Sequence, residues 1–261
     1  MISPNHFLSR AIRLLYPHGQ VRRVRRGPLR GARFIVTPGM GATYAWGVDT
    51  MNFKLLGQKV PTGSVVYDVG ANCGQMALFF SRICGPSGRV ISLEPVPENF
   101  GKLRANLEIN GCRNVDPMCM ALGRDAEPKH FSFDPARHTM GTFAGSAVKL
   151  PDHGATLQVA CTTMDKLVRD GTPPPQFIKL DVEGSGAEVI AGAEETIGRH
   201  RPAIYFEVHA ATPESPELGA LRELQSRWGY TVRDLDGTLN DNPGPMWGAA
   251  VWCEPPLAEQ Q

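Results

Sequence analysis

The chain lacks several features that would settle its class at once. No run of apolar residues approaches the roughly 18 that a membrane-spanning helix requires. None of the six cysteines forms a CxxC pair, and the seven histidines show neither HExxH nor HxH spacing. These absences argue against a zinc knuckle and predict no dedicated metal site. The irregular cysteine spacing is more typical of reduced thiols than of a disulfide scaffold, which predicts a cytoplasmic protein.

Acidic residues are absent from the first 48 positions, and the same stretch has no lysine. Its arginines are Arg10, Arg13, Arg22, Arg23, Arg25, Arg26, Arg30 and Arg33. The rest of the chain carries 19 Lys and Arg against 26 Asp and Glu, so the net charge of +1 conceals a basic start and an acidic body. The stretch is an organellar transit peptide, a basic arm for anionic lipid, nucleic acid or an anionic substrate, or an irregular lobe whose arginines pair with the acidic body. We hypothesise that residues 1–33 contact an anionic surface or partner and do not build the catalytic core.

The apolar content predicts one α/β domain, because 261 residues with 42% hydrophobic residues suffice for a single core. We assign residues 1–48 to a basic N-terminal arm or lobe and 49–261 to this domain. Strands and helices alternate from about residue 64. The predicted strands cover 65–70, 90–94, 115–122, 157–161, 177–181, 203–208, 230–235 and 247–252, and the predicted helices cover 73–83, 97–110, 185–199 and 216–228. Residues 123–155 are rich in Gly, Pro, His and Asp, which predicts a loop region with one strand at 130–133.

Acidic residues fall at or near the ends of four predicted strands. Strands that alternate with helices imply a mostly parallel sheet covered on both faces, and ligands bind outside the carboxyl ends of such strands. The four acids are Asp68, Glu94, Asp181 and Glu207. We therefore expect them to line one pocket. Lys179, inside a predicted strand, is either a buried lysine paired with one of these acids or a residue of the site.

The strongest local motif is the glycine-rich turn Asp68-Val-Gly-Ala-Asn-Cys-Gly74. Its spacing is not GxGxxG, and no Lys-Ser/Thr follows it, so it predicts neither a dinucleotide fingerprint nor a P-loop. A strand, a glycine turn and an acid at the end of the next strand suit a nucleoside without phosphates. Glu94, 20 residues after Gly74, could accept hydrogen bonds from both ribose hydroxyls. The alternative is a plain tight turn and a solvated glutamate.

Further motifs follow this turn in order. They are Glu94-Pro-Val-Pro-Glu-Asn-Phe100, Leu103-Arg-Ala-Asn-Leu-Glu-Ile-Asn-Gly111, Cys161-Thr-Thr-Met-Asp165, Ile178-Lys-Leu-Asp-Val-Glu-Gly184 and Glu207-Val-His209. Together with the turn, they closely resemble the FkbM family of S-adenosylmethionine-dependent methyltransferases, from about residue 60 to 210. The resemblance implies a class I methyltransferase fold, which is a Rossmann-like, seven-stranded, mostly parallel sheet with helices on both faces. Residues 49–261 would then be the methyltransferase domain.

The resemblance also implies the cofactor and the residues that bind it. The cofactor would be S-adenosyl-L-methionine, placed over the first two strands. Its methionine part would lie against Asp68, Gly70, Ala71, Asn72 and Gly74. Glu94, next to Pro95, would hold the ribose, and Asn99, Ala121 and Leu122 would border the adenine. Asp181 is placed beside the cofactor.

The family methylates hydroxyl groups of sugars, glycolipids and secondary metabolites, so the resemblance implies O-methylation of a small-molecule or glycan acceptor, with no obligatory protein partner. A hydroxyl acceptor needs a general base within hydrogen-bond reach. The candidates are His209, Asp181 and Glu183. His209 suits the role best because its ordinary pKa of about 6.5 lies near working pH. Glu207, two residues earlier on the same strand, would orient the imidazole.

The chain departs from the family pattern at one position. After Asp-Val-Glu-Gly the family usually has any residue and then Glu, whereas this chain has Ser185-Gly186. Glu188 lies roughly 200° further around a helix and does not simply replace the missing acid. Two other functions stay open. The Arg-rich arm would suit a nucleic-acid methyltransferase, and the missing acid would suit a non-catalytic S-adenosylmethionine-binding protein.

Overall fold

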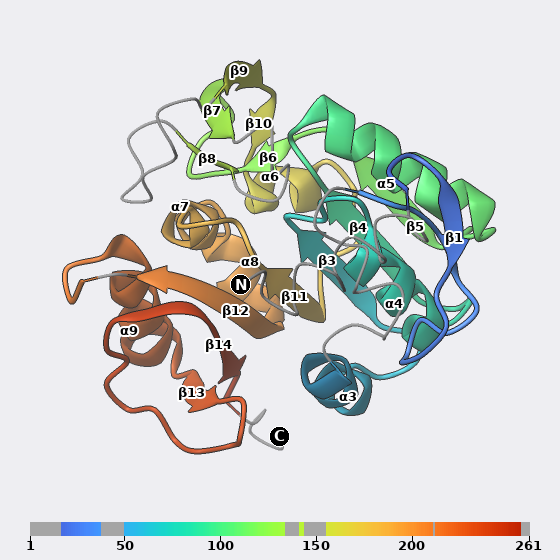
Figure 1. The fold of residues 1–261 in the computed structure, drawn as a ribbon. Helices are drawn as coiled ribbons and strands as arrows, with labels where there is room; N and C mark the ends of the chain where they lie inside the picture. Colours follow the sequence, from blue (N-terminus) through green and yellow to red (C-terminus); the bar gives the residue numbers. More distant parts are fainter. Residues whose placement is uncertain (1–16, 38–49, 134–140, 144–154, 211, 257–261) are drawn as a thin grey trace, which may run out of the picture.

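A seven-stranded sheet forms the centre of the computed structural model, which describes residues 17–37, 50–133, 141–143, 155–210 and 212–256 (Figure 1). The strand order is β13-β14-β12-β11-β3-β4-β5. The strands are β3 (Val65–Val69), β4 (Arg89–Leu93), β5 (Val115–Met118), β11 (Phe177–Leu180), β12 (Ala203–Ala210), β13 (Thr231–Asp234) and β14 (Met246–Glu254). Every pair from β12 to β5 is parallel, and only β14 runs antiparallel to its neighbours. The predicted mostly parallel sheet is confirmed.

Helices cover both faces of the sheet. Successive residues of a strand point to opposite faces, so neighbouring strand residues pack against different helices. Val66 and Phe177 join one buried cluster, whereas Tyr67 and Ile178, the next residue in each strand, join the other. The first cluster includes side chains from α3 (Thr50–Lys59), α4 (Gln75–Cys84) and α5 (Pro97–Ile109). The second includes side chains from α6 (Met164–Arg169), α7 (Gly186–Ala191), α8 (Glu194–His200) and α9 (Pro216–Trp228).

The N-terminal segment forms a hairpin of β1 (Val21–Arg23) and β2 (Arg33–Ile35) that packs on the α4 side of the sheet. Val24, Leu29 and Phe34 are at most 2% exposed and belong to the same buried cluster as α4. The hypothesis that residues 1–33 stay outside the core is therefore wrong for the described residues 17–33. Contact of the exposed arginines with an anionic partner stays a prediction.

One predicted helix, over 185–199, is wrong, because the structure has two short helices there, α7 and α8. The break falls at Gly192, where a Cβ atom would lie 1.9 Å from the carbonyl oxygen of Gly123. The carboxylate of Asp165 accepts hydrogen bonds from the backbone N–H groups of Glu195 at 3.0 Å and Thr196 at 2.8 Å. These contacts start a new helix after the break, because they satisfy donors that a helix leaves unpaired at its N-terminus.

The expectations between residues 115 and 161 also need correction. The segment 115–122 is divided between β5 and β6 (Ala121–Leu122), and β6 pairs with β10 (Cys161–Thr162) outside the main sheet. A three-stranded antiparallel sheet consists of β8 (Gly141–Phe143), β7 (Lys129–Phe133) and β9 (Ala155–Val159). The predicted strand at 130–133 is confirmed within β7, and the loop prediction for 134–140 and 144–154 lies outside the described residues.

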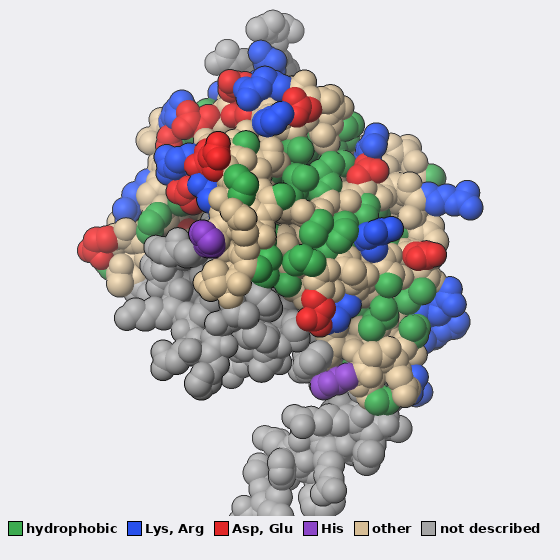
Figure 2. All heavy atoms as spheres, turned by 90° about the horizontal axis from the view of Figure 1, so that it is seen from above, with side chains coloured by type: hydrophobic (Ala, Val, Ile, Leu, Met, Phe, Trp, Pro, Cys, Tyr) green, Lys and Arg blue, Asp and Glu red, His purple; other side chains and the backbone are tan. Residues whose placement is uncertain are grey.

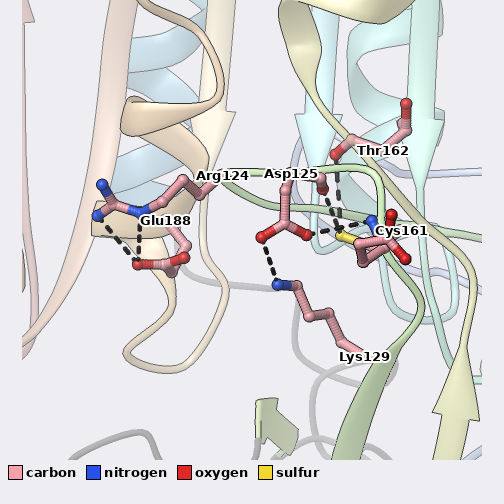
Figure 3. A network of polar contacts seen from close by, with 7 residues as sticks. Arg124, Asp125, Lys129, Cys161, Thr162 and Glu188 are labelled. Atoms are coloured by element: carbon pink, nitrogen blue, oxygen red, sulfur yellow. Dashed lines mark hydrogen bonds and ion pairs between the residues drawn. The ribbon is translucent and has the colours of Figure 1, made fainter.

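Two ion pairs lie at the surface near the segment that joins β6 to β7. Arg124, which follows β6, donates to Oε1 of Glu188 on α7 from Nη2 at 3.2 Å, and Lys129 pairs with Asp125 at 2.7 Å (Figure 3). Glu188 therefore pairs with an exposed arginine and does not replace the acid missing at position 186, as predicted.

Two expectations from the composition concern membrane-spanning helices and the cysteines. Among the described helices, none has both the length and the apolar character needed to cross a bilayer. All six cysteines are free, and burial raises the pKa of the Cys73 thiol to about 11, as expected for a packed thiol. Figure 2 shows that apolar side chains gather near the middle of one face while charges of both signs surround them.

Candidate functional site

The glycine turn after β3, which we call the cradle, packs closely against the end of β11 and against α5. Gly70 and Gly74 have φ angles of 78° and 89°, in the left-handed region that favours glycine. A Cβ atom on Gly70 would lie 1.9 Å from the carbonyl oxygen of Asp181, and one on Gly74 would lie 2.6 Å from Cδ1 of Leu103. Both positions therefore require glycine, because a side chain at either one would collide with the protein itself.

Glu94 joins this turn to the end of β4. Its Oε2 accepts a hydrogen bond from the backbone N–H of Asn72 at 2.9 Å, and its Oε1 accepts one from that of Val96 at 3.0 Å. The residue is 5% exposed, and burial raises the pKa of its carboxyl to about 7. The structure thus brings together the turn, Glu94 and the half-buried Pro95, as the sequence predicted for a cofactor site.

The residues expected to border an adenine are separated. Asn99 lies beside Glu94 and donates from Nδ2 to Oε1 at 3.4 Å. Ala121 packs in the same small cluster as Val96, which also places it near this loop. Leu122, by contrast, packs in the main core on the α9 side of the sheet. A contact of Leu122 with the cofactor stays a prediction.

Lys179 connects the cradle with the acids further along the sheet. Its side chain is 4% exposed, and Nζ lies 3.4 Å from both Oδ1 of Asp68 and Oδ2 of Asp181. It also donates to the carbonyl oxygen of Gly70 at 2.8 Å. The prediction of a buried lysine paired with the acids is confirmed. Asp68 itself is 0% exposed, so its carboxylate lies beneath the turn, and a contact of Asp68 with the cofactor stays a prediction.

The three candidate bases converge at the ends of β11 and β12, where they form a cluster with Glu207. Nε2 of His209 lies 3.3 Å from Oε2 of Glu183 and 3.6 Å from Oε1 of Glu207. Asp181 follows β11 at the level of Glu207 in the neighbouring parallel strand. Burial, together with repulsion from Asp181, raises the pKa of both Glu183 and Glu207 to about 7. We call Asp181, Glu183, Glu207 and His209 the acid–histidine cluster.

Exposure distinguishes the members of this cluster. The side chains of Asp181, Glu183 and Glu207 are 31%, 22% and 30% exposed, whereas that of His209 is 3% exposed. Burial lowers the pKa of the imidazole, which favours its neutral form. The carboxylates therefore face solvent, and the imidazole lies behind them. Glu207, which the sequence predicted as an acid of the pocket and as a partner of His209, is an accessible member of the cluster.

Glu217 on α9 is a buried carboxylate that sequence reasoning missed. Its Oε2 accepts from the backbone N–H of His209 at 2.6 Å, and its Oε1 accepts from that of Gly186 at 3.1 Å. A Cβ atom on Gly186 would lie 2.8 Å from this Oε1 and 2.4 Å from the ring of Phe206. Packing therefore requires the glycine of the unusual Ser185-Gly186 pair. Phe206 and Glu217 occupy the space that a side chain at position 186 would need.

The cluster also contains a donor set that a metal ion could use. One ligand atom each from Asp181, Glu207 and His209 lies within 4.8 Å of the others. The sequence could not indicate this set, because its members come from two strands separated by a helix pair. Lys179 already places an ammonium group 3.4 Å from Asp181. The absence of a dedicated metal site stays a prediction.

The raised pKa values make the stability of the cofactor-free protein depend on pH. Glu94, Glu183 and Glu207 have an ordinary value of 4.5, whereas in the folded chain their pKa is about 7. Between these values the folded state holds more protons than the unfolded state, so the free energy of unfolding falls as the pH rises from about 4.5 to about 7. His209 opposes this trend below pH 6.5, because its folded-state pKa is lowered, but it is one group against three.

We therefore expect a lower urea midpoint at pH 7.5 than at pH 5.5. A Glu183→Gln/Glu207→Gln variant should show a smaller difference between the two pH values. A midpoint that rises over this range in the wild type would contradict the raised pKa values.

The sequence of this chain is similar to those of known methyltransferases. A family model described as the methyltransferase FkbM domain matches residues 68–232. The 31-O-demethyl-FK506 methyltransferase FkbM of Streptomyces tacrolimicus is 26% identical over 202 residues, covering 67% of this chain and 76% of that protein. The hexuronic acid methyltransferase AglP of Haloferax volcanii is 28% identical over 184 residues, covering 70% of this chain and 72% of that protein.

Solved structures include similar folds at lower identity. The methyltransferase FkbM of Methylobacillus flagellatus KT gives a TM-score of 0.47 at 19% identity, and the match covers 73% of this chain and 43% of that one. Fibrillarin of Aeropyrum pernix with natively bound S-adenosyl-L-methionine gives 0.47 at 16% identity, covering 90% of this chain and 97% of that one. The family model covers more than half of the chain and includes both the cradle and the acid–histidine cluster. The chain therefore belongs to the FkbM family of S-adenosylmethionine-dependent methyltransferases.

Proposed function

We propose that this methyltransferase transfers a methyl group to a hydroxyl oxygen of a sugar, a glycolipid or a secondary metabolite. The observation that carries the proposal is the acid–histidine cluster, which presents three partly exposed carboxylates beside the cofactor cradle. Transfer to a hydroxyl requires removal of a proton, and two of these carboxyls have a pKa of about 7, close to the value at which a general base works best at neutral pH.

The cradle fits S-adenosyl-L-methionine on two observations. The left-handed Gly70 and Gly74 form a tight turn without side chains at these two positions, and Glu94 presents a buried carboxylate that accepts a hydrogen bond from the same turn. Glu94 would hold the ribose hydroxyls, and the backbone of the turn would lie against the amino-acid part. The bound cofactor supplies an electrophilic methyl group on a sulfonium.

Glu207 is the base that we assign. It belongs to the exposed side of the cluster, whereas the imidazole of His209 is covered by its carboxylate neighbours. Glu207 would take the proton of the acceptor hydroxyl, whose oxygen would receive the methyl group that the bound cofactor would supply. His209 is a positioning residue that fixes the carboxylates of Glu183 and Glu207 from behind. Lys179 holds Asp181 from below.

The named relatives support this class of acceptor. One is described as a 31-O-demethyl-FK506 methyltransferase and the other as a hexuronic acid methyltransferase. The family model, which matches residues 68–232, includes the residues of the cradle and the cluster. The packing of Gly186 against Glu217 weakens the case for a non-catalytic protein, because the departure from the family pattern leaves the cluster complete.

The test is a methyl-transfer assay with labelled S-adenosylmethionine and a panel of glycosides, glycolipids, hydroxylated metabolites, RNA and DNA. We expect acid-stable methyl ether products from a hydroxyl acceptor, identified by mass spectrometry. Methylated nucleic acid without methyl ethers would instead support a nucleic-acid methyltransferase that uses the Arg-rich arm. Binding of S-adenosylhomocysteine without turnover on any acceptor would support a non-catalytic protein.

Replacing Glu94 with alanine should weaken cofactor binding by about 1–3 kcal/mol, because it removes hydrogen bonds to a charged acceptor. Titration calorimetry with S-adenosylhomocysteine measures this change. Glu98→Ala is the matched control, because Glu98 lies on the neighbouring helix with its side chain 56% exposed and pairs with Lys102 at 2.8 Å. Equal affinities in the two variants would remove Glu94 from the site, and comparable binding of NAD would contradict the cofactor assignment.

A further inference from the structure

A groove of about 490 Å³ shares Glu207 with the acid–histidine cluster. It lies on β12, β14 and β13, the strands at one edge of the sheet (Figure 1). Its lining includes Tyr205 and Glu207 of β12, Ala250 of β14, and Asp234 and Leu235 at the end of β13. Its volume falls within the usual range for small-molecule sites. Since Glu207 belongs to both the groove and the cluster, a molecule in the groove reaches the proposed base directly.

The strand pairing explains why this space is open. The register between β12 and β14 shifts between Val208 and His209, and Gly248 is the extra residue opposite them, with a φ of 64°. Such a bulge bends a strand and redirects its neighbours. Ala250, which follows this bulge and lies opposite Glu207 in the register, has a short side chain that leaves the face of the sheet uncovered beside Glu207.

The described residues that line the groove have one sign of charge. They include the carboxylates of Glu207 and Asp234 and no lysine, arginine or histidine. Asp234 accepts a hydrogen bond from Nδ2 of Asn240 at 2.9 Å, which fixes one carboxylate oxygen. Asp181 and Glu183 add further negative charge on the cluster side. An anionic group in this groove would meet carboxylates without a lining cation, and like charges at close range disfavour binding.

We infer that this groove is the acceptor subsite and that it selects a neutral or amino-bearing hydroxylated ring over a ring that carries a carboxylate. The inference rests on the proposed function, since it assumes that the acceptor donates a hydroxyl proton to Glu207. Tyr205 and Leu235 supply apolar contacts for the ring, and the carboxylates accept hydrogen bonds from its hydroxyl or ammonium groups. A ring that carries a carboxylate would be repelled by Glu207 and Asp234.

The test compares acceptors that differ only in charge. An aryl glucoside, the matching glucosaminide and the matching glucuronide are assayed for kcat/KM with the full chain and S-adenosylmethionine. We expect the glucuronide to be at least tenfold poorer than the glucoside, and the glucosaminide to be at least as good as the glucoside. Asp234→Lys should reduce the discrimination against the glucuronide, because it places a cation at the rim.

Occupancy of the groove is tested separately from turnover. Ala250→Leu should weaken glucoside binding to the S-adenosylhomocysteine complex by at least tenfold in calorimetry, with cofactor affinity unchanged. Ala126→Leu, at an exposed position after β6, is the control. Methyl ether formation with a glucuronide preferred, or with Ala250→Leu unaffected, overturns the inference and leaves the proposed function intact. Cofactor binding without methylation of any hydroxyl acceptor overturns both.

Discussion

Turnover should fall by roughly 10²–10⁴-fold when Glu207 is replaced by glutamine, the range for removal of a general base. The amide keeps the size of the side chain and cannot take the hydroxyl proton. Because the pKa of Glu207 is raised to about 7, the wild-type rate should rise with pH up to about 7 and then level off. The variant should lose this acid limb, and its affinity for S-adenosylhomocysteine should stay within about twofold. Initial rates across pH 5.5–9 measure both effects.

Two companion variants make this result specific. Glu188→Gln is the matched control, because Glu188 pairs with Arg124 at the surface, away from the cluster. It should change turnover little. His209→Ala should lower turnover less than Glu207→Gln and shift the acid limb, because the imidazole positions the carboxylates. If Glu207→Gln keeps both rate and limb while His209→Ala loses both, the base is His209 and the assignment to Glu207 is wrong.

Stability should fall by about 3–5 kcal/mol when Lys179 is replaced by methionine, the usual cost of leaving a buried charge without its partner. Asp68 is 0% exposed, and the ammonium of Lys179 lies 3.4 Å from its carboxylate. The substitution also removes the donor to the carbonyl oxygen of Gly70 at 2.8 Å. The loss should be smaller at pH 5.5 than at pH 8, because Asp68 can then become neutral by taking up a proton. Urea unfolding at both pH values measures the change.

A double substitution tests the reason for this loss. Asp68→Asn combined with Lys179→Met removes both charges and should recover part of the stability, as expected for two residues in contact. Lys166→Met is the control, because Lys166 and Asp170 form an exposed pair at 2.6 Å of the kind that contributes little. A Lys179→Met variant within about 1 kcal/mol of wild type would show that the buried pair contributes nothing to folding.

The central sheet could be predicted because its strands are short apolar runs between clear breakers. β3, β4, β11 and β12 lie where the sequence placed them, and α9 covers the predicted 216–228. The division of one predicted helix into α7 and α8 could not be foreseen, because it depends on a backbone approach between Gly192 and Gly123, which are distant in sequence.

The candidate site was predictable where its residues follow the carboxyl ends of parallel strands, because these ends meet at one edge of the sheet. The turn from Gly70 to Gly74 and Glu94 met as expected, since each ends a strand of adjacent βα units. The signal for Glu207 was present in its spacing from His209, which places both on one side of a strand. Nothing in the sequence pointed to Glu217, because α9 begins beyond the segment of resemblance and meets Gly186 only through the fold.

The contact between Gly186 and Glu217 also restricts how this chain can change over evolutionary time. A glutamate at position 186, the family's usual residue, has no room while Glu217 and Phe206 occupy their present places. Loss of Glu217 alone would leave the N–H groups of Gly186 and His209 without this acceptor. Either single step is therefore costly, so the two positions should co-vary among descendants of this sequence, and a motif search that demands an acid at 186 would discard active enzymes.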